Sequence, residues 1–147
     1  MRSVVATFLL LLLSTVSASA YWQYAEWGMT PTQIAAASHG QANACQGDRA
    51  ACAGGAGLAI DSTQMLGMTA AVAFFFDGQG QPNRTVVTFK DADFGLISGL
   101  LQGIHGPPVS DQPGPSPTRV YRDTRRDSTI TLIGSTPVTM SYRPARP

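Results

Sequence analysis

Two cysteines and the nearer of the two histidines have types and positions that could bind a metal or respond to redox chemistry. Cys45 and Cys52 are separated by six residues, a wider gap than the two residues typical of zinc and redox motifs. Two thiols so placed pair in an oxidising compartment, so the spacing favours a disulfide that closes a short loop. His39 could join them as a third ligand. A metal- or redox-responsive site at His39, Cys45 and Cys52 is therefore an alternative interpretation.

The two histidines of the chain, His39 and His105, are each followed by glycine and are expected in the last turn of a helix. An imidazolium there opposes the negative end of the helix dipole. A small hydrolase is a third interpretation, which would need one histidine beside a serine and a carboxylate. The sequence holds no Gly-x-Ser-x-Gly, His-Glu-x-x-His or phosphate-cradling Gly-x-x-x-x-Gly-Lys motif. It therefore predicts no catalytic residue, no metal ligand and no cofactor.

Aromatic and basic residues supply the candidates for binding a partner. Four aromatics lie within seven residues near the start of the chain, and tryptophan and tyrosine are favoured anchors at interfaces. A second group of arginines could dock an anionic group through two-pronged hydrogen bonds, although such a run is also typical of a solvated hairpin end. The predicted partner-binding residues are Tyr21, Trp22, Tyr24, Trp27, Arg119 and Arg122.

Charge and length limit the function classes. The 147 residues carry 10 basic and 9 acidic side chains, so no strong field points to nucleic acid or to an anionic membrane. Residues 1–20 have a basic start at Arg2, an apolar run and a small-x-small end at Ala18–Ala20, which predicts a signal peptide. The interpretation is a periplasmic or secreted protein with one domain at 21–147 and no membrane span after signal removal.

The elements that must position these residues follow from caps and periodicity. Thr30, Pro31 and Gln33 form the start of a helix expected to run to His39. Residues 41–57 lack periodicity and are predicted to be a loop. A second helix is expected from a cap at Asp91 or Asp93 to residue 105, and strands are expected from 58 onward and at 68–76, 84–90, 118–122, 128–133 and 138–143.

This order of elements predicts an α+β fold. Two helices would pack on one face of a mainly antiparallel sheet of about six strands, as a pseudo-duplicated α-β-β-β unit. Glycines recur every four residues on the second helix, at Gly95, Gly99 and Gly103. Each costs helix stability relative to alanine, so the stripe is expected to pack closely against the sheet, the first helix or a second chain.

The block Trp27-Gly28-Met29-Thr30, together with Gln33 and Ile34, resembles a motif of small exported bacterial proteins of unknown function. The layout is similar to that of beta-lactamase-inhibitor-protein-like repeats and of small outer-membrane assembly lipoproteins, although the chain lacks a lipidation cysteine. The resemblance implies an exported binding or accessory module that is not an enzyme. Its expected partner is an envelope protein or a small ligand, and not a nucleic acid.

Overall fold

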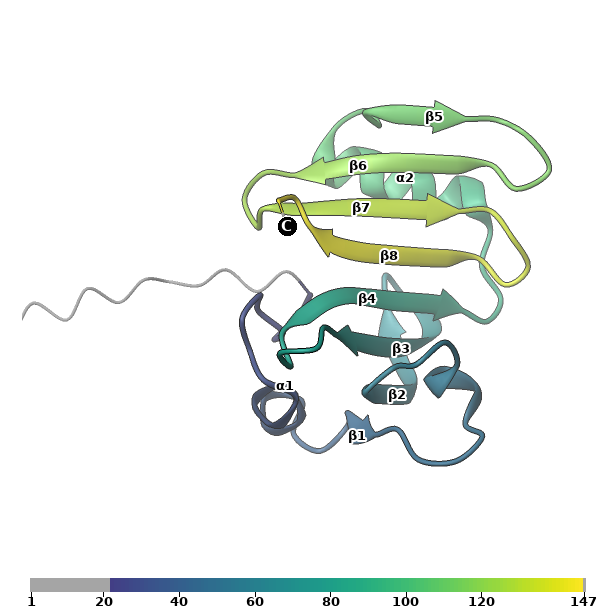
Figure 1. Cartoon of the computed structure of the whole chain (residues 1–147). Helices are drawn as coiled ribbons and strands as arrows, with labels where there is room; N and C mark the ends of the chain where they lie inside the picture. Colours follow the sequence, from purple (N-terminus) through teal and green to yellow (C-terminus); the bar gives the residue numbers. More distant parts are fainter. Residues whose placement is uncertain (1–21, 147) are drawn as a thin grey trace, which may run out of the picture.

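The computed structural model describes residues 22–146, in which eight strands form one antiparallel sheet (Figure 1). The strand order is β1-β2-β3-β4-β8-β7-β6-β5, so β4 and β8 join the two halves of the chain at the centre. The strands are β1 (Asn43–Ala44), β2 (Leu58–Met65), β3 (Met68–Phe76), β4 (Pro82–Phe89), β5 (Ser110–Gln112), β6 (Thr118–Asp123), β7 (Ser128–Ile133) and β8 (Thr139–Pro144). The helices are α1 (Pro31–Ala37), the 3-10 turn η1 (Ala50–Cys52) and α2 (Phe94–His105).

The predicted fold class, two helices on a sheet of about six strands, is wrong. The sheet has eight strands, and the described residues contain only two short α-helices, so the fold is rich in sheet. The additional strands are β1 and β5, which lie at the two edges and have two and three residues. Strands so short show no alternation of polar and apolar residues. The sequence therefore predicts a loop at 41–57, where β1 lies, and a proline-rich loop between the second helix and Pro117, where β5 lies.

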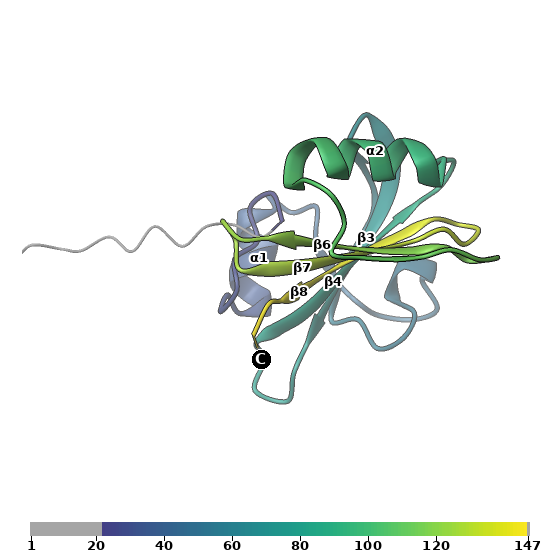
Figure 2. The same ribbon diagram turned by 90° about the horizontal axis from the view of Figure 1, so that it is seen from above.

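One face of the sheet, here called the covered face, carries the main core. Successive side chains of a strand point to opposite faces, and alternate residues of the central strands are buried on this side. A single cluster joins the covered face to α1 and α2. Figure 2 shows α2 lying over one side of the twisted sheet. The largest fully buried side chains of the core include Trp22, Phe74, Phe89, Tyr121, Ile130, Leu132 and Met140.

Helix α1 starts as its sequence predicts and ends earlier. The Thr30 side chain accepts a hydrogen bond from the backbone N–H of Gln33, and the Gln33 side chain accepts one from the backbone N–H of Thr30. This capping box satisfies backbone donors that have no partner within the helix. The helix ends at Ala37, because Ser38 is the C-cap and His39 takes a positive φ of 52°. Only Ile34 of α1 is buried in the core.

Helix α2 packs on β6 and β7 and begins at the Asp93 cap, whose carboxylate accepts from the N–H of Leu96. Ile97 and Leu101 are buried, whereas Leu96, Leu100 and Ile104 are exposed. The expected close packing of the glycine stripe on the sheet or α1 is not found. A Cβ added at Gly99 or at Gly103 would meet no atom within 4 Å.

The opposite side of the sheet, here called the open face, has a second and smaller cluster. Ala73 and Phe75 of β3 pack there with Ala56 and Cys45. The structure joins Cys45 to Cys52, with Cα atoms 5.5 Å apart, so the bond holds the segment 45–57 at one end of this face. Between residues 22 and 146, no helix is long and apolar enough to cross a membrane.

Candidate functional site

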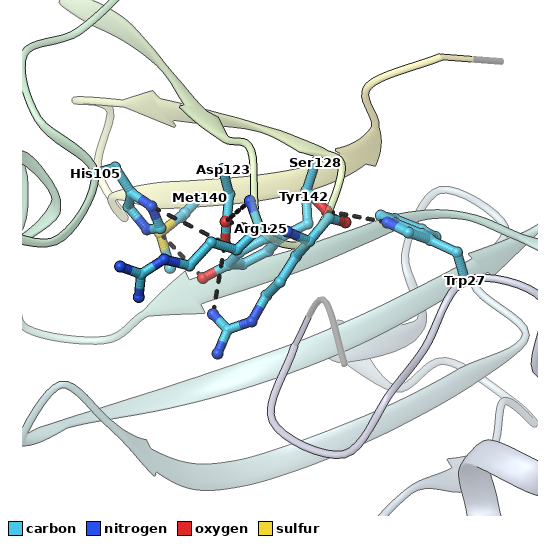
Figure 3. A network of polar contacts seen from close by, with 8 residues as sticks. Trp27, His105, Asp123, Arg125, Ser128, Met140 and Tyr142 are labelled. Atoms are coloured by element: carbon cyan, nitrogen blue, oxygen red, sulfur yellow. Dashed lines mark hydrogen bonds and ion pairs between the residues drawn. The ribbon is translucent and has the colours of Figure 1, made fainter. Parts of the chain in front are cut away.

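A network of polar contacts lies where α2 ends beside the turn between β6 and β7 (Figure 3). His105 is the last residue of α2, and Asp123 is the last residue of β6. The Nδ1 atom of His105 lies 4.0 Å from a carboxylate oxygen of Asp123, and both side chains are nearly buried. Asp123 also accepts from the backbone N–H groups of Arg125 and Arg126 and lies 3.5 Å from the Arg126 guanidinium.

Burial dominates the electrostatics of this network. It lowers the pKa of His105 below the ordinary value of 6.5; Asp123 acts in the opposite direction, and Arg126 and Arg125 lower it further. Burial also raises the pKa of the Tyr142 phenol above its ordinary value. The Tyr142 hydroxyl lies 3.8 Å from the sulfur of Met140. The neutral imidazole and the neutral phenol are therefore the favoured states near pH 7.

The hydrogen bonds of this network tie segments of the chain together. Ser128 donates to the backbone carbonyl of Arg126 and accepts from the indole N–H of Trp27 at 3.0 Å. That contact links the N-terminal segment to β7, which is 101 residues away in sequence. An open hollow of about 390 Å³ lies beside His105 and the turn residues 122–126. Within the described part of the chain, no hydrogen bond joins His105 to a serine.

The predicted aromatic surface is largely internal. Trp22 is only 2% exposed, stacks edge-on against Phe74 at 5.4 Å and donates its indole N–H to the sulfur of Met65. Tyr24 is half-buried and lies edge-on to Trp22, and burial raises its pKa. Trp27 is half-buried, and Tyr21 lies outside the described residues. The prediction that Trp22 is an exposed anchor for a partner is therefore wrong. Its large apolar ring is instead part of the core beneath the sheet.

The two predicted docking arginines lie on different faces. Arg119 belongs to the covered face, where it pairs with Asp111 at 3.1 Å, donates to Ser98 and lies over the ring of Phe94. Arg122 lies on the open face, where its guanidinium donates to the hydroxyl of Thr129. Arg122 alone of the two therefore points to a surface without a carboxylate partner in the part of the chain that the structure describes.

The proposed metal ligands are not brought together. Cys45 and Cys52 are bonded to each other, and His39 is exposed after the end of α1. Over residues 22–146, no three side chains among histidine, cysteine, aspartate and glutamate form a group that could hold a metal ion.

A row of arginines crosses the open face at one end of the sheet. The cross-strand register places Phe75 beside Arg84, Arg143 beside Thr129, and Thr129 beside Arg122. Thr85 pairs with Tyr142, so Arg84 and Arg143 are neighbours on adjacent strands. The arginine row is defined here as Arg84, Arg143 and Arg122. None of the three forms an ion pair among the described residues.

Two further rows of uncharged side chains, which are alanines, hydroxylated residues and β-branched aliphatic residues, continue the open face. The second row, from β3 to β6, contains Ala73, Val86, Ser141, Thr131 and Val120. The third row contains Ala71, Thr88, Thr139, Ile133 and Thr118. No acidic residue occurs in any of the three rows. Arginines placed side by side destabilise a sheet, so this arrangement carries a cost that the fold itself does not require.

Three shallow hollows adjoin on this face. One of about 430 Å³ is lined by the segment 54–55 and by Phe75, Arg84 and Arg143. Another of about 370 Å³ is lined by the same two arginines and by Val86, Ile133 and hydroxyl side chains. A third of about 200 Å³ lies between Phe75, Val86 and the alanines of the disulfide loop. Arg84 and Arg143 therefore lie where the two larger hollows meet, and the guanidinium of Arg84 stacks 4.0 Å above the ring of Phe75.

The sequence does not by itself identify Arg84 and Arg143 as site residues, although it carries part of the signal. The alternation in residues 138–143 places Arg143 on the wet side of its strand with Thr139 and Ser141. The alternation within residues 84–90 likewise places Arg84 on the face opposite to the buried Thr85 and Val87. The missing information is the order of the strands. The end of β4 and the start of β8 are separated by 49 residues, and the sequence does not show that these two strands pair.

Comparisons with known proteins supply no family for this chain. No family model matches it, and no curated protein matches it. The resemblance to small exported proteins and to beta-lactamase-inhibitor-protein-like repeats thus gains no support from these comparisons. The chain is distantly similar to the crystal structure of a DUF4309 family protein (YjgB) from Bacillus subtilis subsp. subtilis str. 168. That match has 13% identity and a TM-score of 0.48, and it covers 88% of this chain and 83% of the other.

Proposed function

We propose that this protein is an exported binding module and that the open face is its ligand-binding surface. The observation that carries the proposal is the arginine row, which lacks carboxylate partners among residues 22–146 and borders two adjoining hollows. Ligand sites are concave and combine apolar walls with a few convergent polar groups. Hollows of about 370 and 430 Å³, lined by both kinds of side chain, fit that description.

Export is supported by two features. Residues 1–20 have the pattern of a signal peptide, and the Cys45–Cys52 pair suits an oxidising compartment. The disulfide loop also forms one wall of the open face, because Ala50, Ala51 and Ala53 line the smallest hollow. Oxidation outside the cytoplasm would thus fix the wall of the site as well as stabilise the chain.

The test is a ligand screen followed by nuclear magnetic resonance. A set of small charged and neutral compounds is added to the isotopically labelled protein, and the shifted backbone amides are mapped. Compounds that bind are expected to shift the amides of Val86, Thr131 and Ser141. Shifts confined to His105 and the turn at 123–127, or no binding by any compound, would contradict the proposal.

A blocking substitution sharpens this test. Ser141→Trp fills the hollow between β4, β8 and β7, and it should abolish binding without unfolding the protein. Ser116→Trp, in the exposed loop before β6, introduces the same side chain away from the open face and should leave binding unchanged. Equal binding by both variants would place the ligand elsewhere.

A further inference from the structure

The chemistry of the open face specifies a class of ligand, and this inference rests on the function proposed above. Its charge is wholly positive across three strands, with Arg84 on β4, Arg143 on β8 and Arg122 on β6. Elsewhere in the described residues, Arg49, Arg119 and Arg126 are matched by Asp61, Asp111 and Asp123. Arg125 and Arg146 form no ion pair there either, but only on the open face do two unpaired arginines face each other on adjacent strands. An anionic group would neutralise the row, and arginine binds carboxylate and phosphate with paired hydrogen bonds.

The spacing of the row suggests more than one anionic group. Neighbouring strands lie about 4.8 Å apart, so Arg84 and Arg143 can hold one anionic group between them. Arg122 is two strands beyond Arg143, with β7 between, or roughly 10 Å away by the same strand spacing. A ligand that carries two anionic groups separated by that distance would contact the whole row.

The surface next to the row is suited to hydroxyl groups. Thr131, Thr139 and Ser141 line the hollow beside Arg84 and Arg143, and all three are half-buried. Among the described residues, no side-chain hydrogen bond involves any of these three hydroxyls. Each can donate one hydrogen bond and accept others, as the hydroxyl groups of a sugar also can. Val86 and Ile133 add apolar surface between them.

We propose that the open face binds an anionic saccharide, with one acidic group held between Arg84 and Arg143 and a second one reaching Arg122. The sugar ring lies over the hydroxyl side chains of β7 and β8. An acidic peptide would also satisfy the arginine row, but it offers the partly buried hydroxyls only one donor and one acceptor per backbone unit, whereas a sugar ring presents several hydroxyl groups at once. The observations therefore favour the saccharide.

The test is isothermal titration calorimetry with galacturonate, tetragalacturonate, neutral galactose and a tetraglutamate peptide as probes. We expect tetragalacturonate to bind most tightly, galacturonate more weakly, and galactose without measurable affinity. Galactose binding as tight as that of galacturonate would overturn the role of the arginines. Tetraglutamate binding as tight as that of tetragalacturonate would overturn the saccharide in favour of an acidic peptide.

Substitutions locate the binding. Arg84→Gln and Arg143→Gln should each weaken both anionic sugars at least about tenfold. Arg122→Gln should weaken tetragalacturonate but leave galacturonate unchanged. Arg125→Gln, which removes the same charge at an exposed position beside the β6–β7 turn, should change neither. Equal losses in Arg125→Gln and Arg143→Gln would show nonspecific attraction and overturn the site.

The screen described under the proposed function separates the two failures. If none of the anionic sugars binds while other compounds shift the amides of Val86, Thr131 and Ser141, the saccharide is wrong and the open face remains a binding surface. If no compound shifts those amides, both proposals fail.

Discussion

The two faces of the sheet use the same backbone for different purposes. On the covered face, large side chains are buried and the charged groups are paired, as Asp123 is with Arg126 and Arg119 with Asp111. On the open face, alanines and hydroxylated side chains alternate with a few apolar ones such as Phe75 and Ile133. Arg84, Arg143 and Arg122 have no ion-pair partner there in the described chain. We attribute the paired charges to stability of the fold and, on the function proposed above, the unpaired arginines of the open face to an anionic ligand. Substitutions on the two faces should therefore affect different measurements.

The largest effect is expected from truncating the covered face. Trp22→Ala removes a buried ring that contacts Phe74, and the cavity should lower the free energy of unfolding by about 3–5 kcal/mol. Thr131→Ala on the open face should lower it by about 1 kcal/mol or less. Urea denaturation monitored by circular dichroism measures both values. Similar losses in the two variants would remove the distinction between the faces.

The next largest effect concerns the buried carboxylate of the covered side. Asp123→Ala leaves the backbone donors of Arg125 and Arg126 without their acceptor, and we expect a loss of about 3 kcal/mol. Asp48→Ala, at an exposed position, is the matched control and should change stability by less than about 0.5 kcal/mol. A loss as small as that of the control would show that Asp123 does not organise the β6–β7 turn.

A smaller effect should appear as a dependence on pH. The pKa of His105 is lowered mainly by burial, so the unfolded chain binds the proton more readily than the folded one. The contribution of His105 to the free energy of unfolding is therefore fully present above pH 6.5, the pKa of the unfolded chain. It is lost as the pH falls through the lower pKa of the folded protein. The melting temperature should therefore fall between pH 7.5 and pH 5, and less so in His105→Gln.

His39→Gln is the matched control for this measurement, because it removes the exposed histidine after α1. Equal pH dependence in His105→Gln and in the unsubstituted protein would contradict the assignment to the network beside Asp123.

The smallest effect is expected at the arginine row. Arg143→Gln removes a charge that lies beside Arg84 on the neighbouring strand, so stability should stay equal or rise by up to about 0.5 kcal/mol. Denaturation at low and at moderate salt tests this, because salt screens exposed like charges and should reduce the difference. A clear loss of stability would mean that Arg143 supports the fold. It would contradict the distinction between a stabilising covered face and a binding open face.

Most of the local structure could be predicted, because its causes are local. The capping box at Thr30 and Gln33 is confirmed, and the apolar stripe ending at His105 marks α2 correctly. The alternation of residues in β7 and β8 predicts which side chains are buried, such as Ile130, Leu132 and Met140. The edge strands β1 and β5 could not be predicted, because two or three residues carry no period.

The candidate site was only partly predictable. The sequence predicts Arg122 and Arg119 as docking residues on the same grounds. Arg122 lies in the arginine row, whereas Arg119 is paired with Asp111. The sequence predicts Trp22 as an interface anchor, and the structure places it in the core. Residue type indicates what a side chain could do, but only the fold decides whether an arginine is neutralised by an internal carboxylate or a tryptophan is buried in the core.

The sequence by itself determined the caps, the periodic strands, the cysteine pair and the alternation that divides each strand into a wet and a dry side. These properties depend on residues a few positions apart. The order of strands and the burial of Trp22 were decided by the tertiary structure, since they depend on which apolar surfaces meet across the whole chain. The juxtaposition of Arg84, Arg143 and Arg122 belongs to this second group. The pairings of β4 with β8, of β8 with β7 and of β7 with β6 bring together charges from positions up to 59 residues apart.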